Sequence, residues 1–226
     1  MADKYSVFFN EKKKEYDLGS GKYKIEKLET IPRKIIYRII KRLFDFIVSF
    51  ICIIICIIPM IIISVLIKID SKGPVFYKQE RLGKNKKPFK ILKFRSMRID
   101  AEKNGAQWAD KDDSRVTKLG KRLRDSRLDE IPQLFNILLG QMSFVGPRPE
   151  RKIFYDKFAT YIDGFEQRML IVPGLTGFAQ INGGYDLKPE EKIIYDIEYI
   201  KKRSLWFDIK LFFATIVVVF SHEGAR

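Results

Sequence analysis

The sequence has very little histidine and very little cysteine. One histidine, His222, stands near the C-terminus, and the two cysteines, Cys52 and Cys56, lie inside an apolar run. A histidine-based catalytic triad and a histidine-rich metal centre are therefore excluded, and two cysteines in an apolar run indicate neither a disulfide framework nor a metal site. Any catalysis has to rest on carboxylates, lysines, arginines and hydroxyl groups.

Negative charge is also scarce. The chain of 226 residues has 43 lysines and arginines against 28 acidic residues, which gives a net charge of +15. The partners should therefore be anionic: phosphorylated small molecules, lipid headgroups or nucleic acid. Residues 1–33 are polar and lack the apolar core of a cleavable signal peptide. We expect them to form a polar N-terminal extension with little regular structure.

One long apolar run interrupts this polar composition. Residues 46–67 carry no charge, and as a straight helix they would extend ~33 Å at ~1.5 Å per residue, enough for a single span. Pro59 is a natural bend point, because it has no amide hydrogen and clashes with the preceding turn. Basic residues flank both ends of the run, as expected when both ends are cytoplasmic. The residues therefore allow a single span or a re-entrant anchor over residues 34–70.

Residues 71–226 should form a compact, mostly helical cytosolic domain with one small β-hairpin. Two β-rich runs within residues 74–97 are separated by the turn-forming GKNKKP. Residues 116–140 predict a basic helix and then a helix with an apolar face, and Pro189 suits the first turn of another helix. Residues 205–220 are apolar but carry two charges, which is typical of an interfacial helix.

The stretch RLRDSRLDEIPQLFN places two adjacent carboxylates, Asp129 and Glu130, after a run of arginines. A structural interpretation makes Asp129 the N-cap of the next helix, with Glu130 and Pro132 in its first turn. A functional interpretation uses the same features, because a helix N-terminus and guanidinium groups lower the pKa of a carboxylate and keep it ionised as a nucleophile or Mg²⁺ ligand. The spacing alone favours the structural interpretation.

Other basic residues offer phosphate contacts. Arg148 stands between two prolines in GPRPE, either as part of a stiff turn or as a phosphate ligand on a pre-set backbone. Lys93 and Arg95 share one face of a strand in KFRSM, a pattern also expected of a solvated basic face. Aromatic residues in the basic hairpin could stack on bases. No nucleic-acid signature is present, however, and a membrane anchor favours lipid and phosphate partners, so we expect no nucleic-acid partner.

Several motifs occur in a fixed order around the interrupted apolar run: RLFD (42–45), KFRSM (93–97), RLDEIPQLFN (127–136), MSFVGPRPE (142–150), PGLTGFAQING (173–183) and SLWFDIK (204–210). Together they resemble the bacterial sugar transferases, the monotopic polyprenyl-phosphate phosphoglycosyl transferases, from about residue 33 to the C-terminus. The four-helix membrane region of long family members is absent from the sequence, so the resemblance is to the short form.

The resemblance implies a membrane-associated α+β fold with a defined orientation. Residues 34–70 would be a re-entrant anchor, helix–break–helix at Pro59, with both ends on the cytoplasmic side of the bacterial inner membrane. Residues 71–226 would be the cytosolic catalytic domain. Membrane lipid, a UDP-sugar and polyprenyl phosphate would be the partners.

The resemblance also implies a reaction. Asp129 and Glu130 would be the family's Asp–Glu dyad. Asp129 attacks the β-phosphate of the UDP-sugar and UMP leaves, and polyprenyl phosphate, usually undecaprenyl phosphate, then takes the sugar phosphate from the aspartyl intermediate, which starts assembly of a surface glycan such as capsule or exopolysaccharide. Mg²⁺ would bind at the same two carboxylates. The phosphate contacts would come from Arg124 and Arg148, with Lys93 and Arg95 as further candidates.

Two departures from the common pattern leave the transferred sugar open. Phe178 stands where many relatives have tryptophan, and GGYD (183–186) replaces a stretch that is often more basic. The glycan pathway, the role of residues 1–33, the oligomeric state and the division of roles between Asp129 and Glu130 also stay open. A membrane-tethered basic binding or scaffold protein without turnover is the alternative function.

Overall fold

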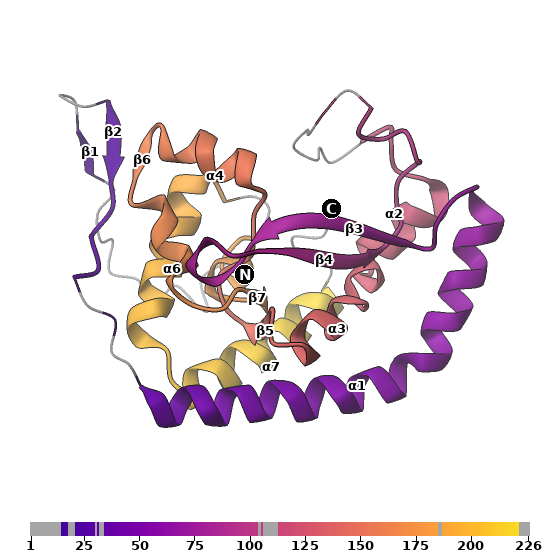
Figure 1. Ribbon diagram of the computed structural model, residues 1–226, viewed down its shortest axis with the longest axis horizontal. Helices are drawn as coiled ribbons and strands as arrows, with labels where there is room; N and C mark the ends of the chain where they lie inside the picture. Colours follow the sequence, from indigo (N-terminus) through magenta and orange to yellow (C-terminus); the bar gives the residue numbers. More distant parts are fainter. Residues whose placement is uncertain are drawn as a thin grey trace.

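One long helix, α1 (Ile35–Asp70), lies along the base of the molecule and turns upward along one side, and most other elements lie in the angle between its two arms (Figure 1). The computed structural model describes residues 15–17, 21–29, 31, 34–103, 105, 113–184 and 187–221. Helices and short strands are mixed in this part of the chain, as an α+β fold requires.

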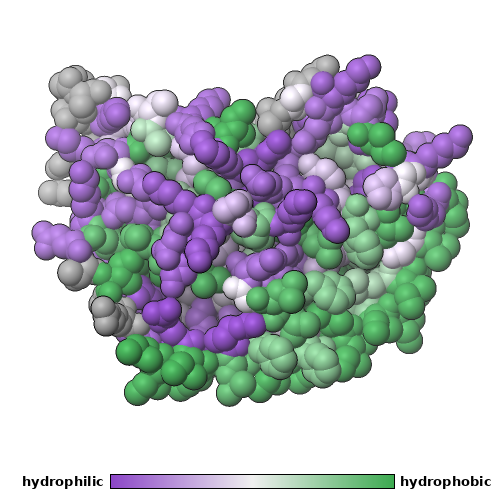
Figure 2. All heavy atoms as spheres, viewed as in Figure 1, coloured by the Kyte–Doolittle hydropathy of each residue, from purple (hydrophilic) through white to green (hydrophobic). Residues whose placement is uncertain are grey.

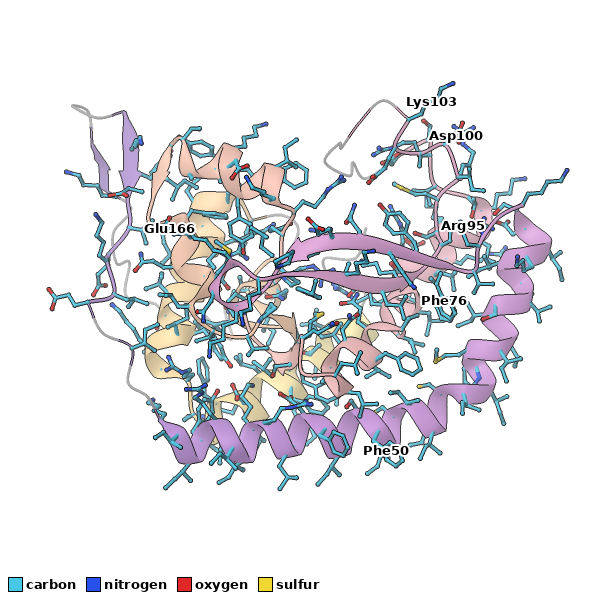
Figure 3. All side chains as sticks on the ribbon, viewed as in Figure 1. Phe50, Phe76, Arg95, Asp100, Lys103 and Glu166 are labelled. Atoms are coloured by element: carbon cyan, nitrogen blue, oxygen red, sulfur yellow. The ribbon has the colours of Figure 1, made fainter. Side chains whose placement is uncertain are left out.

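The helix α1 bends in its C-terminal half. The bend lies on the C-terminal side of Phe50 (Figure 3), and Pro59 is the proline inside the helix. Proline bends a helix because its ring clashes with the preceding turn and it cannot donate a hydrogen bond. Helical structure nevertheless continues from Ile35 to Asp70, because the turns on either side keep their own hydrogen bonds. The expected helix–break–helix is therefore a single bent helix.

The helix α1 carries its apolar side chains outward. Ile55 and Ile58 are 69% and 67% exposed, whereas the polar residues Asp45 and Ser49 are buried. Figure 2 shows hydrophobic residues gathered along the base and the adjoining side of the molecule, where α1 lies. By length and composition the helix is able to cross a membrane. An exposed apolar surface of this extent marks an interaction site.

The predicted β-hairpin is confirmed. β3 (Phe76–Leu82) and β4 (Pro88–Phe94) pair antiparallel over seven residue pairs. The connection contains the 3₁₀ turn η3 (Lys84–Lys86), in which Asn85 adopts φ 56°, a left-handed conformation that asparagine tolerates better than most residues. The hairpin crosses the middle of the molecule above α1 (Figure 1).

Three short helical elements follow: α2 (Lys118–Asp125), the 3₁₀ turn η4 (Leu128–Glu130) and α3 (Gln133–Leu138). Thr117 caps α2, because its Oγ1 accepts a hydrogen bond from the Gly120 amide at 2.9 Å. Asn136 ties α3 to β4: its Oδ1 accepts from the Leu92 amide and its Nδ2 donates to the Lys90 carbonyl, both at 2.9 Å. The helices predicted within residues 116–140 are therefore confirmed, with η4 between them.

Polar side chains of α1 fasten the helix to the domain. Arg42 caps the end of α3 by donating to the carbonyls of Ile137 and Leu138 at 2.8 and 2.7 Å. Asp45 accepts a hydrogen bond from the Phe144 amide at 3.1 Å. These contacts explain why the RLFD motif, although it begins an apolar run, contains two charged residues.

The second half of the chain contains β5 (Ser143–Val145), α4 (Lys152–Ala159), β6 (Ile162–Asp163), η5 (Phe165–Leu170), β7 (Gly174–Thr176), α5 (Phe178–Ile181), α6 (Pro189–Lys202) and α7 (Leu205–Ser221). β5 and β7 pair in parallel. α6 begins at Pro189 as predicted, and Ile193, Ile197 and Ile200 are all buried, because they recur on one face of the helix.

The helix α7 lies against the N-terminal arm of α1. Asp208 of α7 accepts hydrogen bonds from Tyr37 Oη at 2.8 Å and Lys41 Nζ at 2.7 Å, both on α1. It also accepts from Tyr199 Oη of α6 at 2.6 Å. The opposite face of α7 exposes large apolar residues: Trp206, Phe213 and Val217. An apolar outer face beside α1 is what an interfacial helix requires.

The first described residues add a small sheet to this half of the molecule. β1 (Glu15–Asp17) pairs antiparallel with β2 (Lys22–Lys24), and β2 pairs in parallel with β6. Ile25 is buried, and Gln167 Oε1 accepts a hydrogen bond from the Leu28 amide at 2.6 Å. These two three-residue strands are the regular structure in the described part of residues 1–33, whose apolar residues pack against η5 and α6.

Candidate active site

A cavity of about 360 Å³ opens between the β3–β4 hairpin, η4 and the segments that follow β5 and β7. Eleven of its lining residues are lysine or arginine and four are aspartate or glutamate. Such a concave surface, on which basic residues outnumber acidic ones, attracts anions. The fold brings all the side chains that the sequence analysis singled out for catalysis or phosphate binding to this cavity: Lys93, Arg95, Arg124, Asp129, Glu130 and Arg148.

Asp129 and Glu130 belong to the 3₁₀ turn η4, just before α3. The N-cap of η4 is Arg127 and that of α3 is Pro132, so Asp129 caps neither element. The N-cap interpretation of Asp129 is therefore wrong. Arg127 adopts φ 56°, and this left-handed residue turns the chain sharply between α2 and η4.

Glu130 accepts hydrogen bonds from two cations that come from different parts of the fold. Lys93 Nζ on β4 donates to Glu130 Oε1 at 2.6 Å. Arg148 donates from Nη1 to Oε2 at 3.4 Å and from Nη2 to Oε1. Lys93 Nζ also lies 3.7 Å from Asp129 Oδ2. Glu130 therefore holds Lys93 and Arg148 beside Asp129, while Asp129 is the less tightly engaged carboxylate.

The two carboxyl groups have opposite pKa shifts. Burial raises the pKa of Asp129 more than the Lys93 ammonium lowers it, and the charge of Glu130 adds to the increase. Burial also acts to raise the pKa of Glu130, but Arg148 and Lys93 outweigh burial and hold that pKa well below its ordinary range. The basic cluster does act to lower the pKa of Asp129, as expected, but burial outweighs it and the net shift is upward. Neighbouring carboxyl groups with separated pKa values are typical of functional sites.

The buried ion pair of Arg168 and Asp196, which the sequence analysis missed, supports the backbone of Arg148. Arg168 Nη2 donates to the Arg148 carbonyl at 3.0 Å, and Arg168 Nε donates to Asp196 Oδ2 at 2.5 Å. On the other side of the GPRPE turn, Arg81 Nη1 donates to Glu150 Oε2 at 2.9 Å. The turn is therefore stiff and also directs Arg148 into the cavity. The available sequence signal was that Asp196 lies beside the buried isoleucines of α6.

The two remaining arginine candidates have different surroundings. Arg124 Nε donates to Ser96 Oγ at 2.9 Å, and the residue lines the cavity near the two carboxylates. Arg95 lies at the end of α1 (Figure 3). It donates to the carbonyls of Ser71 and Lys72, both at 2.6 Å. The geometry therefore favours Arg124 as a phosphate contact and gives Arg95 the structural role of capping α1. The predicted strand face shared by Lys93 and Arg95 does not form, because β4 ends at Phe94.

The two carboxylates are compatible with a magnesium ion that takes most of its coordinating oxygens from substrate phosphates and water. The described residues contain no group of three or more histidine, cysteine, aspartate or glutamate side chains with metal-binding geometry. Mg²⁺ does not need such a group, because it is commonly bound by one or two carboxylates together with substrate phosphates and water. Asp129 suits this role better than Glu130, whose oxygens already accept hydrogen bonds from Arg148 and Lys93.

The segment after β7 contributes to the cavity and to the core. Phe178 is buried, and its ring packs edge-on against Tyr195 and Phe207 with centroid distances of 5.6 and 5.3 Å. Its neighbours Ala179 and Gln180 line the cavity instead. The departure from tryptophan at Phe178 is therefore a change in the core. Tyr185, which belongs to the second departure (GGYD, 183–186), lies outside the described residues.

These features define an enzyme-like site for phosphorylated compounds, built beside an apolar helix. The sequence profile of the bacterial sugar transferases matches residues 36–222 of the chain. The chain therefore belongs to the bacterial sugar transferase family.

Curated relatives share this region. A UDP-N-acetylgalactosamine-undecaprenyl-phosphate N-acetylgalactosaminephosphotransferase of Aeromonas hydrophila is 45% identical over 163 residues, 71% of this chain and 38% of the relative. A UDP-glucose:undecaprenyl-phosphate glucose-1-phosphate transferase of Klebsiella pneumoniae is 44% identical over 164 residues, 70% of this chain and 35% of the relative. The galactosyl transferase CpsE of Streptococcus agalactiae is 37% identical over 166 residues, 68% of this chain and 35% of the relative. The matched region thus spans little more than a third of these relatives.

Proposed function

We propose that this protein transfers a sugar 1-phosphate from a UDP-sugar to a polyprenyl phosphate, such as undecaprenyl phosphate, and releases UMP. The observation that carries the proposal is the arrangement of Asp129 beside Glu130, Lys93 and Arg148 in a basic cavity. The activities for which the relatives are named support the two substrate classes. The product would be the lipid-linked sugar from which a surface glycan is assembled.

The reaction runs in two displacements at one phosphorus atom. A carboxylate oxygen of Asp129 attacks the β-phosphorus of the UDP-sugar, and the bond to the bridging oxygen breaks, so that UMP leaves with that oxygen. A phosphate oxygen of the polyprenyl phosphate then attacks the same phosphorus, and the bond to Asp129 breaks, which restores the carboxylate. A covalent relay of this kind lets two dissimilar substrates react in turn at one site.

The neighbouring residues divide the remaining work. Glu130 stays ionised and holds Lys93 and Arg148, whose charges face the β-phosphate. Arg124 contacts the diphosphate from the α2 side of the cavity. A Mg²⁺ ion bound at Asp129 and Glu130 with the diphosphate would neutralise negative charge on the leaving group. In this division Asp129 is the nucleophile, and Glu130 positions the cations.

We further propose that α1 is a re-entrant anchor in the inner membrane and that the domain faces the cytoplasm. Both ends of α1 are hydrogen-bonded to the same domain: Lys34 Nζ donates to the Arg203 carbonyl at 2.8 Å, and Arg95 donates to the Ser71 carbonyl at 2.6 Å. A straight spanning helix would place these ends on opposite sides of the bilayer. A helix bent at Pro59 instead keeps the cavity at headgroup depth, where a lipid phosphate is presented.

The topology is tested by labelling. Cysteines are introduced singly at Thr30 and Lys72, in a chain whose Cys52 and Cys56 are replaced by alanine, and an impermeant thiol reagent is added to intact cells. Both positions should be protected until the cells are opened. Labelling of one position in intact cells would establish a simple span and overturn the re-entrant anchor.

The mechanism is tested by omitting the lipid. The protein incubated with a panel of UDP-sugars, without polyprenyl phosphate, should release at most one equivalent of UMP and gain one sugar phosphate on the peptide that contains Asp129. Asp129→Asn keeps the size of the side chain but cannot form the acyl phosphate, so it should fold and release no UMP. An adduct on Glu130 would exchange the two roles. Release of no UMP from any UDP-sugar, with lipid present, would leave the alternative of a binding or scaffold protein.

A further inference from the structure

Two glutamines have unpartnered buried amides. In Gln133 and Gln180 both Oε1 and Nε2 are buried, and neither atom has a hydrogen-bond partner among the described residues. Burying an amide without a partner costs free energy, because the group loses its hydrogen bonds to water. Such a residue is either tolerated within the core or satisfied when a ligand binds.

The positions of the two glutamines separate these cases. Gln133 is 0% exposed and does not line the cavity. Gln180 lies on α5 and lines the same cavity as Asp129 and Glu130. A ligand in the cavity would therefore lie beside Gln180 and not beside Gln133, and the Gln180 amide, which is closed to solvent in this structure, would have to turn toward that ligand.

The backbone around Gln180 places its amide beside the turn that carries Arg148. A Cβ atom built on Gly177 would lie 2.8 Å from Gln180 Oε1 and 2.2 Å from the Gly146 carbonyl oxygen. The absence of a side chain at Gly177 thus allows the amide and the start of the GPRPE turn to approach closely. Arg148 Nη1 donates to the Leu175 carbonyl at 3.3 Å, five residues before Gln180, which ties the arginine to the same segment.

The chemistry of the amide identifies its ligand. A neutral carboxamide donates through Nε2 and accepts through Oε1, so it suits hydroxyl groups, which both donate and accept. Phosphate oxygens only accept, and the lysines and arginines of this cavity bind them better through charge-assisted hydrogen bonds. A UDP-sugar carries hydroxyl groups on its hexose and on its ribose, on the two sides of the diphosphate that Arg148 contacts.

We propose that Gln180 is a specificity-determining residue that hydrogen-bonds hydroxyl groups of the carbohydrate part of the UDP-sugar. The inference rests on the proposed function and deepens it, because it assigns a residue to the recognition of the neutral part of the donor. Sites built to hydrogen-bond a hydroxyl group discriminate strongly against substrates that lack it, since their own polar groups are then left unpaired.

The test combines a variant with deoxygenated substrates. Gln180→Met keeps an unbranched chain of similar length and removes the amide. We expect kcat/KM for the preferred UDP-sugar to fall by ~10-fold or more, while KM for polyprenyl phosphate changes by less than ~2-fold, since Gln180 does not contact the lipid in this proposal. Donors that lack single hexose hydroxyls, or the ribose 2′-hydroxyl, should include one that the unaltered protein uses ~10-fold less well and that Gln180→Met no longer distinguishes. The position of that hydroxyl shows whether Gln180 contacts the hexose or the ribose.

Gln133→Met is the matched control, because it removes the other unpartnered amide. It should leave kcat/KM for every donor within ~2-fold of the unaltered protein, and neither variant should lower the thermal unfolding temperature, since an unpaired buried amide is removed in each. Gln180→Leu provides a second variant if Gln180→Met does not fold. Normal kcat/KM in a folded Gln180 variant, or an undiminished hydroxyl effect, would overturn the inference and leave the proposed function standing. Failure of the unaltered protein to bind or use any UDP-sugar would overturn both.

Discussion

Replacing Asp196 by asparagine should destabilise the protein far more than the same replacement of Asp156. Asp196 pairs with Arg168, and the two side chains are 1% and 2% exposed. Asp156 pairs with Lys152 across one turn of α4, and those side chains are 60% and 69% exposed. The two substitutions are chemically identical, so the comparison isolates the effect of burial on an ion pair.

The expected magnitudes follow from solvation. Removing one partner of a buried ion pair leaves an uncompensated buried charge and costs about 3–5 kcal/mol. An exposed pair contributes about 0–1 kcal/mol, because water solvates and screens both charges. For a domain of this size, 1 kcal/mol shifts the unfolding temperature by about 2–4 °C. Asp196→Asn should therefore lower that temperature by ~6–20 °C and Asp156→Asn by no more than ~4 °C.

The assay is thermal unfolding of the full chain in detergent or nanodiscs, followed by circular dichroism. The double variant Asp196→Asn/Arg168→Met should recover part of the loss, because no buried charge is left unpaired. Asp196→Asn should also reduce UDP-sugar turnover even below its unfolding temperature, since Arg168 donates to the Arg148 carbonyl. If Asp196→Asn and Asp156→Asn behave alike, Arg168 is satisfied without Asp196, and the support assigned to this pair is wrong.

Three further substitutions test the site and the anchor. Arg148→Lys keeps the charge but loses the planar fork, so kcat/KM for UDP-sugar should fall by ~10-fold, or ~1.4 kcal/mol; full activity would mean that Arg148 only stiffens the turn. Glu130→Gln removes a negative neighbour that raises the pKa of Asp129, so Asp129 should stay ionised at more acidic pH. The acidic limb of the plot of kcat against pH should therefore move to lower pH, and an unmoved limb would contradict the coupling of the two groups. Pro59→Ala restores the missing donor and removes the ring clash, so it should straighten α1 and lower activity, and labelling from outside should detect a spanning fraction; unchanged labelling and activity would exclude Pro59 as the cause of the bend.

Local sequence signals determined the elements and their order. The charge-free run required an apolar helix, the β-rich runs around GKNKKP required a hairpin, and Pro189 with its periodic isoleucines required a helix buried on one face. These signals are strong because they depend on neighbours within a few residues. The motifs also identified Asp129, Glu130 and Arg148, and the fold places them in one cavity.

The tertiary structure decided which of the basic residues serve the cavity. The sequence places Lys93 and Arg95 on one strand face, but β4 ends at Phe94, and Lys93 binds Glu130 while Arg95 caps α1. The pairing of Arg168 with Asp196 joins residues that are 28 positions apart, and nothing in the local pattern specifies that contact.

Burial, which only the complete fold determines, also decided the pKa values of the two carboxyl groups. Asp129 and Glu130 are adjacent in sequence and chemically similar, but desolvation raises the pKa of Asp129, and two hydrogen-bonded cations lower that of Glu130. The strand β2 near the start of the chain also depends on distant segments, because it pairs with the edge of β6 and the residues around it pack against the apolar surface of η5. A sequence specifies which groups are available, but the dielectric environment and the partners of each group are set by segments that come from elsewhere in the chain.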